Sequence, residues 1–402
     1  MIVLDTTTRK IQILVDATAT TTESPVVASW EDLTTTTNLV GGSQIITTGA
    51  TAVDAVAVPS ASTQRVVKFM SVYNADTVAH SYTFRYNDNG TTRNLFVPLL
   101  SPGQTAIYDN GLWVVVPTYL SIDPGLCEGR LTLTTGVPVT TSDVTGATTI
   151  YFTPYKGNRL SLYTNSAWTL YAFSEKSVAL GTLASATIPN DVFIYDNAGT
   201  LTLELVAWTS TTARATALVL QDGVLVKSGS TNKRYLGTFC PTATTTTEDS
   251  KTKRLLWNMY NRIKRHMSMI DTTDSWTYST AAFRLQNNGA GSGTGKLEMV
   301  RGIDEDCATA RVMGLCSSGV AQSPSVGIGL DSTTVNSAQI FAGGVADTTA
   351  VNKSCHAAYE GCPGLGYHYL AWLEYGQSAT LTWYGDAGVT QLQSGIVGEV
   401  FA

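Results

Sequence analysis

Four aromatic residues near the C-terminus are the side chains in this sequence that most directly suggest ligand chemistry. They lie in two β-prone segments and comprise two tryptophans and two tyrosines: Trp372, Tyr375, Trp383 and Tyr384. Flat rings with polar edges suit the faces of sugars, so these residues could form a glycan-stacking platform. Aromatic residues in the core of a β-sandwich give the same pattern. The pattern favours the core, and both interpretations stay open.

A second group has the side chains of a metal site. Two cysteines and two histidines fall in one short stretch: Cys355, His356, Cys362 and His368. Structural zinc sites usually separate paired ligands by roughly two to four residues, and the interval between these two cysteines is longer. Glycine and proline residues around the second cysteine favour a loop. We therefore expect no metal and no cofactor.

Motifs for nucleophilic catalysis are missing from the sequence. It contains no G-x-S-x-G motif, and four histidines provide few bases for a Ser/His/Asp arrangement: His80, His266, His356 and His368. The acidic run at 304–306 lacks the spaced oxygen ligands of a calcium loop, which favours a solvated turn. Two of the 31 acidic residues could still form a glycosidase pair. We expect a chain that is not an enzyme, with a glycan depolymerase as the alternative.

The charge balance argues against nucleic acid as a partner. The chain has 25 basic and 31 acidic residues and a formal charge of −6, so it has no strong positive field. One basic cluster lies near the middle of the chain: Lys251, Lys253, Arg254, Arg262, Lys264, Arg265 and His266. Because this cluster is short and the chain is acidic, we expect it to pair with acids of a neighbouring subunit.

Charged residues are scarce, at 14% of the sequence against about 25% in typical soluble proteins. A monomer with so few charges would be short of solubility, so we expect other copies or other proteins to cover part of its surface. No apolar stretch reaches the roughly 18 residues of a membrane span, and residues 1–10 do not resemble a signal peptide. We expect synthesis in the cytoplasm and no membrane insertion.

The cysteine content is even, which is compatible with disulfides: Cys127, Cys240, Cys307, Cys316, Cys355 and Cys362. A protein made in the cytoplasm begins with reduced cysteines, and cysteine is among the most buried residue types. We therefore expect mostly buried thiols. Cys355 and Cys362 form the pair most worth testing for a disulfide.

Alternation of apolar and polar residues predicts strands along most of the chain. Residues 65–73 and 81–86 alternate, and Asn-Gly pairs at 89–90 and 110–111 separate β-prone runs. Asn-Gly is a strong hairpin signal because both central residues must accept positive φ. Prolines near both ends of residues 117–125 indicate a linker.

The exception is a segment with helical periodicity. Leu255, Met259 and Ile263 recur at four-residue spacing after an acidic cap, which predicts one short helix. We therefore predict an all-β fold of consecutive antiparallel β-sandwich or jelly-roll-like domains with one short helix. The predicted parts are an N-terminal β-sandwich at 1–118, a central β domain at 119–245, a helical connector at 246–269 and a C-terminal jelly-roll-like domain at 270–402.

The middle of the chain resembles a module of tailed-bacteriophage virion proteins over roughly residues 125–280. The matching stretches are 129–135 (GRLTLTT), 148–157 (TTIYFTPYKG), 222–229 (DGVLVKSG), 233–238 (KRYLGT), 247–250 (TEDS) and 253–262 (KRLLWNMYNR). The first segment, with 61–65 (ASTQR) and 86–93 (YNDNGTTR), resembles the small N-terminal β domains of phage fibre and head-decoration proteins.

This resemblance implies a structural protein of the virion, either a tail fibre or spike or a decoration subunit. It implies self-association, usually as a homotrimer, together with contacts to other virion proteins of the head or tail. Residues 1–118 would attach the protein to the particle, and residues 270–402 would face outward and could contact a host surface glycan. The alternative is a receptor-binding protein that binds or depolymerises glycans. The resemblance implies no catalytic residues.

Overall fold

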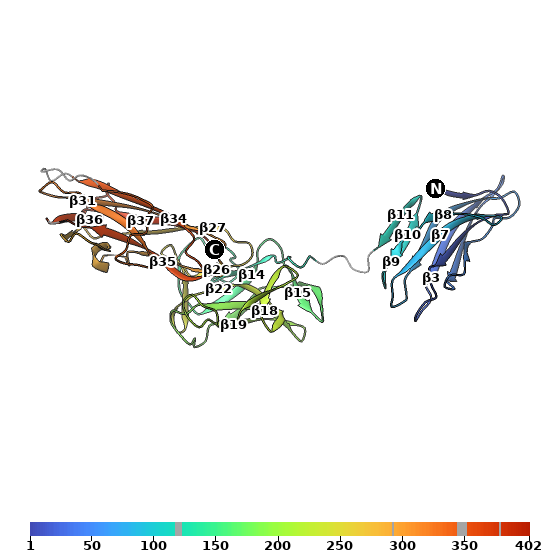
Figure 1. The fold of residues 1–402 in the computed structure, drawn as a ribbon, viewed down its shortest axis with the longest axis horizontal. Coiled ribbons are helices and arrows are strands. Elements are labelled where there is room, and N and C mark those ends of the chain that lie inside the picture. Colours follow the sequence, from blue (N-terminus) through green and yellow to red (C-terminus); the bar gives the residue numbers. More distant parts are fainter. Residues whose placement is uncertain (117–122, 292, 344–351, 378) are drawn as a thin grey trace. The chain divides into compact units, whose positions relative to one another are not determined.

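The computed structural model describes residues 1–116, 123–291, 293–343, 352–377 and 379–402. The chain divides into two compact units, Met1–Ser121 and Ile122–Ala402 (Figure 1). Strands dominate the described residues, which confirms the predicted all-β class with antiparallel sheets. Within those ranges the only helix is one 3-10 turn, η1 (Gln286–Gly289). The linker expected at 117–125 falls mainly on residues 117–122, which lie outside the described residues.

The first unit is a sandwich of two antiparallel sheets. One sheet has the order β11 (Leu112–Val116), β10 (Thr105–Asp109), β6 (Gln64–Tyr73), β3 (Pro25–Leu33) and β4 (Asn38–Ile46), with β1 (Ile2–Leu4) also paired to β6. The other has the order β5 (Val53–Val56), β2 (Arg9–Val15), β7 (His80–Asp88) and β8 (Thr91–Phe96), with β9 (Leu99–Leu100) paired to β7. Ile13, Met70 and Phe84 lie fully buried between the two sheets.

The two predicted Asn-Gly hairpins are confirmed. Asn89 and Gly90 connect β7 to β8, and Asn110 and Gly111 connect β10 to β11. All four residues have positive φ, from 46° at Asn110 to 103° at Gly111. These φ values match the turn geometry that the right-handed twist of paired strands favours.

The central part of the second unit contains three antiparallel sheets. The first is β12 (Gly129–Thr132), β14 (Thr149–Pro154) and β17 (Lys176–Ala179), and the second is the hairpin β15 (Arg159–Thr164) and β16 (Ala167–Ala172). The third has the order β19 (Thr200–Ala207), β18 (Asn190–Asn197), β22 (Ser230–Phe239), β21 (Val224–Lys227) and β20 (Leu218–Gln221), with β26 (Leu256–Asn258) paired to β22.

Two larger sheets form the rest of the unit. The eight-stranded sheet has the order β13 (Val144–Ala147), β24 (Thr246–Asp249), β25 (Lys253–Arg254), β30 (Lys296–Arg301), β35 (Gly366–Tyr375) and β29 (Phe283–Leu285), with β23 (Pro241–Ala243) on β24 and β32 (Ser325–Leu330) on β35. The seven-stranded sheet has the order β27 (Lys264–Ile270), β37 (Gly395–Phe401), β31 (Ala308–Ser317), β34 (Lys353–Gly361) and β33 (Ile340–Ala342), with β36 (Leu381–Tyr384) paired to β31 and to β28 (Ser275–Tyr278).

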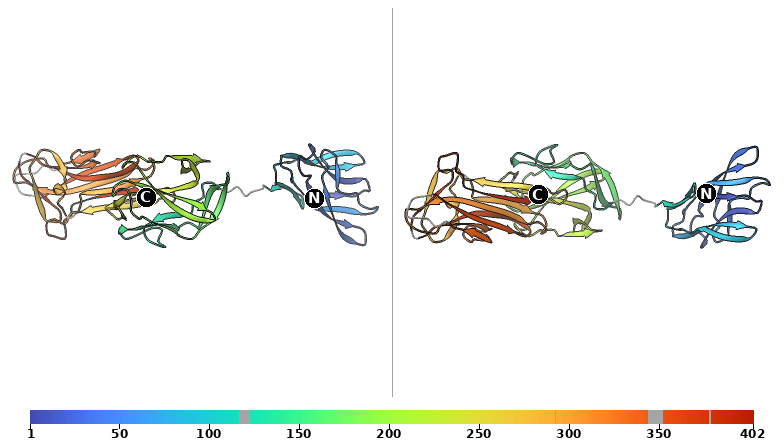
Figure 2. Two further views of the ribbon diagram at one scale, coloured as in Figure 1. Left: turned by 90° about the horizontal axis from the view of Figure 1, so that it is seen from below. Right: turned by 90° about the horizontal axis from the view of Figure 1, so that it is seen from above.

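These two large sheets pack face to face as the C-terminal sandwich, and their strands from β31 onward run side by side in orange to red in Figures 1 and 2. Their shared core takes Met267, Val312 and Ile396 from the seven-stranded sheet, and Leu297 and Trp372 from the eight-stranded sheet. Inward and outward residues alternate along β27, β37 and the first six residues of β31, so this part of the sheet has one buried face and one open face.

The predicted helical connector at 246–269 is wrong, because these residues form β24, β25, β26 and β27. Leu255, Leu256 and Trp257 are all buried, so the segment is covered on both sides, whereas a surface helix leaves one face in water. Its arginines are not on a solvated face either. Arg254 and Arg265 are buried and each donates to Asp249 at 2.9 Å.

The predicted boundaries near 245 and 270 do not separate compact units. The eight-stranded sheet takes β13 and β24 from the central part and β30 and β35 from the C-terminal part, so one sheet spans the proposed division. Arg130 in the central part also donates to the backbone oxygen of Ala402 at 2.6 Å. Residues 122–402 therefore form one unit.

Candidate functional site

The open face of the seven-stranded sheet carries a row of polar side chains that crosses four strands. His266 of β27 lies opposite Glu399 of β37, Glu399 lies opposite Thr309 of β31, and Thr309 lies opposite Glu360 of β34. The side chains of directly paired residues point to the same face of a sheet. The next residue along each strand points to the other face. Met267, which follows His266, and Ala310, which follows Thr309, are buried in the core.

A second row lies two residues further along β31 and has a different character. Arg311 lies opposite Val397 on one side and Ala358 on the other, and Ala358 lies opposite Ile340 of β33. Val397 and Ile340 are 44% and 74% exposed. The open face therefore combines charged groups with apolar contact area.

Between these rows lies a depression of about 800 Å³, which we call the outer-face pocket. It is lined by His266, Thr309, Ala310, Arg311, Gln339, Ile340, Ala358, Tyr359, Glu360, Val397, Gly398 and Glu399. The short side chain of Thr309 lies between two glutamates, and that of Ala358 lies between Arg311 and Ile340. These short residues leave the space that the pocket occupies, and its volume is within the range of roughly 300–1,000 Å³ typical of ligand sites.

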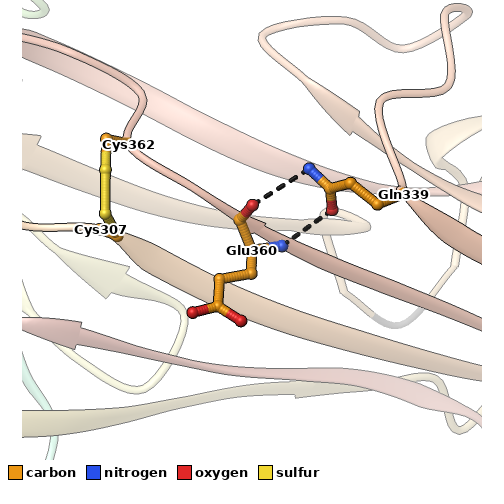
Figure 3. Close-up of a disulfide and its surroundings, with 4 residues drawn as sticks. All are labelled: Cys307, Gln339, Glu360 and Cys362. Atoms are coloured by element: carbon orange, nitrogen blue, oxygen red, sulfur yellow. Dashed lines mark hydrogen bonds between the residues drawn. A yellow bond between two sulfur atoms is a disulfide. The ribbon is translucent and has the colours of Figure 1, made fainter.

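A disulfide bonds the two central strands at one end of the pocket. Cys307 and Cys362 form the bond, with Cα atoms 4.1 Å apart (Figure 3). Ala308 pairs with Gly361 at the ends of the antiparallel strands β31 and β34. Cys307, just before Ala308, therefore lies opposite Cys362, just after Gly361. The suggested Cys355–Cys362 pairing is therefore wrong.

The other four cysteines are buried thiols, as expected: Cys127, Cys240, Cys316 and Cys355. The sulfurs of Cys316 and Cys355 lie 3.8 Å apart in the core of the sandwich. Burial raises the pKa of the Cys127 thiol to about 11 and that of Cys240 to about 12, so both stay protonated at neutral pH.

Hydrogen bonds fix the wall of the pocket formed by Gln339. Its side-chain nitrogen donates to the backbone oxygen of Glu360, and its side-chain oxygen accepts from the Glu360 backbone N–H, both at 3.0 Å. Figure 3 shows that the Glu360 carboxylate points away from Gln339. The carboxylate is thus left available for a ligand, while the backbone of Glu360 is held in place.

Charges in the pocket are only partly compensated. Lys264 forms an ion pair with Glu399. Among the residues that the structure describes, Arg311 has no ion pair or side-chain hydrogen bond, and neither does the Glu360 carboxylate. Both are exposed. The pocket thus offers one guanidinium donor and one carboxylate acceptor without protein partners.

The four aromatic residues from the sequence do not form a surface platform. Trp372 and Trp383 are both 0% exposed and belong to the core of the C-terminal sandwich. The Tyr375 ring packs 5.0 Å from Phe283, and the Tyr384 hydroxyl lies 2.8 Å from the Ser317 hydroxyl. With their indoles inside the core, the tryptophans have no face to offer a sugar.

The cysteines and histidines considered for metal binding are dispersed. Cys362 is in the disulfide, and Cys355 is in the core. The Nδ1 atom of His368 lies 2.7 Å from an Asp331 carboxylate oxygen, and the Nε2 atom of His356 lies 3.2 Å from the Ser354 hydroxyl. No group of three or more His, Cys, Asp or Glu side chains suited to a metal occurs in the described part of the chain.

The basic cluster pairs with acids of its own chain, although we expected acids of a neighbouring subunit. Arg254 and Arg265 bond Asp249, and Lys264 bonds Glu399. Arg262 bonds Glu305 at 2.6 Å and also contacts Asp306, so the acidic run at 304–306 neutralises this arginine. Among the described residues, no helix has the length and hydropathy of a membrane span.

Apart from His266, which belongs to the basic cluster, the residues of the outer-face pocket were not singled out from the sequence. The alternation in 308–313 (ATARVM) places Thr309, Arg311 and Met313 on one side of a strand. That signal shows which side chains share a face. It does not show that β37 and β34 are the neighbouring strands, because those pairings join residues far apart in the chain.

Comparison with known proteins gives little additional information. No family model matches the chain, and no curated protein matches it. A crystal structure of BuGH86 in complex with neoagarooctaose shows 10% identity and a TM-score of 0.20, over 65% of this chain and 33% of that chain. An exo-β-1,3-galactanase from Phanerochaete chrysosporium with β-1,3-galactotriose shows 9% identity and a TM-score of 0.13, over 84% of this chain and 94% of that chain.

The chain spans about a third of the length of BuGH86. The solved structures compared with this chain include a glycoside hydrolase, BuGH86, and the expectation that the chain is not an enzyme is not retained. TM-scores of 0.20 and below provide no argument about shared fold, catalytic residues or mechanism. The resemblance to phage virion proteins stays a prediction.

Proposed function

We propose that the chain binds a glycan in the outer-face pocket of its C-terminal sandwich. The observation that carries this proposal is the pocket itself, a depression of about 800 Å³ on an open sheet face, with hydrogen-bonding and apolar side chains in adjacent rows. Sugars present hydroxyl groups at their edges and C–H groups on their faces, so they need both kinds of contact at once. Glu360 and Thr309 can bond hydroxyls, and Val397 and Ile340 can contact C–H faces.

Rigidity of the site supports this proposal. The pocket lies on paired strands, and a disulfide and two hydrogen bonds between Gln339 and the Glu360 backbone hold the β34 side of it. A site on rigid elements loses less conformational entropy when a flexible glycan binds. The proposed site thus needs little rearrangement before binding.

Substitution of Thr309 by tyrosine tests this proposal, because the larger side chain fills the middle of the pocket without entering the core. Wild type and Thr309→Tyr would be compared on a glycan microarray. Thr277→Tyr is the matched control, since Thr277 is an exposed strand residue that does not line the pocket. We expect specific glycans to bind wild type and Thr277→Tyr but not Thr309→Tyr. Equal binding by all three would contradict the proposal.

A second proposal concerns assembly, as a virion fibre, spike or decoration subunit that associates with itself as a trimer. The supporting observation is an exposed apolar row on the first unit, where Val114, Ile107 and Val27 lie across the open face of one sheet with Ser71 between them. Val114 and Val27 are 45% and 40% exposed. An exposed apolar surface of this kind is typical of a protein contact.

Light scattering tests this assembly. We expect the purified chain to have three times the monomer mass and Val114→Lys to shift it toward the monomer. Thr92→Lys on β8 is the control, since it adds the same charge to an exposed strand of the other sheet. A monomeric wild type that is also absent from purified virions would exclude this second proposal.

A further inference from the structure

We propose that Arg311 makes the outer-face pocket selective for glycans that carry an anionic group, either a carboxylate or a sulfate. This inference rests on glycan binding in the pocket and names the class of glycan. The inference is based on the surroundings of this arginine. Arg311 lies on the central strand β31, lines the pocket and is exposed, and it has no ion pair or side-chain hydrogen bond among the described residues.

Arg311 differs in this respect from five other arginines of the same unit, each of which bonds a carboxylate of the chain: Arg214, Arg254, Arg262, Arg265 and Arg284. Arg311 is also surrounded differently, because its neighbours across both strand pairings are Val397 and Ala358. These neighbours have no side-chain acceptor, so they do not compete with an anion for the guanidinium.

Neither of the nearby glutamates forms an ion pair with Arg311. Glu360 and Glu399 belong to the adjacent row, whose central residue Thr309 is two positions away on β31, about 7 Å along the strand. Lys264 holds Glu399, and the backbone of Glu360 is fixed by Gln339. The cation and the acceptors therefore occupy separate rows.

This separation defines how a charged sugar would lie. A guanidinium has a planar fork that bonds a carboxylate or sulfate through two parallel N–H···O contacts. The anionic group would therefore lie in the row of Arg311, where its neighbours are apolar. It would avoid the row of Glu360, whose charge repels it, and the sugar hydroxyls would donate to Glu360 instead. A neutral glycan makes the hydroxyl contacts and leaves Arg311 unpaired.

Calorimetric titration with three oligosaccharides tests this inference: an oligogalacturonate, a sulfated galactan fragment and a neutral galactan fragment. The proteins are wild type, Arg311→Gln, Arg311→Lys and Arg159→Gln. Arg159 is an exposed arginine of β15 outside the pocket, so its variant loses the same charge at another place. We expect Arg311→Gln to weaken binding of at least one anionic oligosaccharide about tenfold or more and to change neutral binding less than about twofold. Arg311→Lys should fall between, because it keeps the charge and loses the fork.

The outcomes separate this inference from the proposed function. A preference for the galacturonate identifies a carboxylate, and a preference for the sulfated fragment identifies a sulfate. Neutral binding that Thr309→Tyr abolishes, with no effect of Arg311→Gln on any probe, overturns the selectivity and leaves glycan binding standing. No binding of any of the three by wild type, together with an empty microarray, overturns both.

Discussion

Glu360 and Glu399 lie on opposite sides of Thr309, each directly across from it on a neighbouring strand. Two strand spacings separate their Cα atoms by about 10 Å. The short threonine side chain leaves the space between the two carboxylates open, and the outer-face pocket occupies that space. This relationship places two carboxylates on opposite sides of the pocket.

Glu360→Gln is expected to weaken glycan binding about threefold to tenfold, because a hydrogen bond to a charged acceptor contributes about 1 kcal/mol or somewhat more. Glu399→Gln should have a smaller effect, since Lys264 already pairs with that carboxylate. Calorimetric titration with the strongest microarray ligand measures both. A larger loss from Glu399→Gln than from Glu360→Gln would show that this assignment of roles is wrong.

The disulfide is expected to make a large contribution to the stability of the second unit. It closes a loop with a sequence separation of 55, for which the chain-entropy model gives about 4 kcal/mol. The double variant Cys307→Ser with Cys362→Ser should lower the free energy of unfolding by about this amount in a denaturant titration. Denatured wild type should react with a thiol reagent at four cysteines before reduction and six after it. Six reactive thiols before reduction would contradict the assigned bond.

Trp383→Ala is expected to destabilise the C-terminal sandwich by about 3–5 kcal/mol, because it removes a fully buried indole from the core. Trp168→Ala, at a half-buried residue of β16, should cost less. Denaturant unfolding measures both changes. Trp383→Phe should stay folded and keep its glycan ligand. Loss of glycan binding in a stably folded Trp383→Phe would show that Trp383 contributes to glycan binding.

A buried histidine makes the stability of the first unit depend on pH. His80 lies between two carboxylates, with its Nε2 atom 2.8 Å from Asp76 and its Nδ1 atom 2.9 Å from Asp16. Burial by itself lowers the pKa of His80, but the bonds to both aspartates outweigh it and the pKa is raised. Burial by itself raises the pKa of Asp76. Hydrogen bonds from His80, Thr20, Thr21 and Thr77 outweigh this effect and hold the pKa of Asp76 far below its usual range.

The two shifts act at opposite ends of the pH scale. The raised His80 pKa gives stability that is fully present below its unfolded pKa of about 6.5 and is lost as pH rises through the folded pKa. The lowered Asp76 pKa gives stability that is present above its unfolded pKa of about 3.9 and is lost as pH falls toward the folded pKa. The melting temperature of the first unit should therefore fall as pH rises above about 6.5. His80→Gln should remove most of that fall, and an unchanged pH profile in this variant would contradict the role of His80.

Much of the fold could be predicted because its signals are local. The hairpins at Asn89-Gly90 and Asn110-Gly111 follow from two adjacent residues that accept positive φ. The helix prediction at 246–269 was wrong because the spacing of Leu255, Met259 and Ile263 also arises in a segment covered on both sides. Local periodicity does not reveal that β26 is paired to β22 or that β25 is paired to β30.

The site could not be predicted in the same way because it depends on pairings between distant segments. Strands β27 and β37, which supply His266 and Glu399, lie at opposite ends of the C-terminal sequence. The aromatic side chains suggested a glycan-stacking platform from their chemistry alone, yet Trp372 and Trp383 are buried in the core. The residues that line the outer-face pocket are ordinary polar and apolar residues, and only the pairing of five strands brings them together.

Calorimetric titration of wild type and Thr309→Tyr with the same microarray-selected glycan is the most direct test of glycan binding in the outer-face pocket. Both proteins should show the same circular dichroism spectrum and melting temperature, because Thr309 points away from the core. The account predicts saturable binding by wild type and at least a tenfold weaker affinity for Thr309→Tyr. Equal affinities of two equally folded proteins would show that the glycan binds elsewhere and would contradict the central claim.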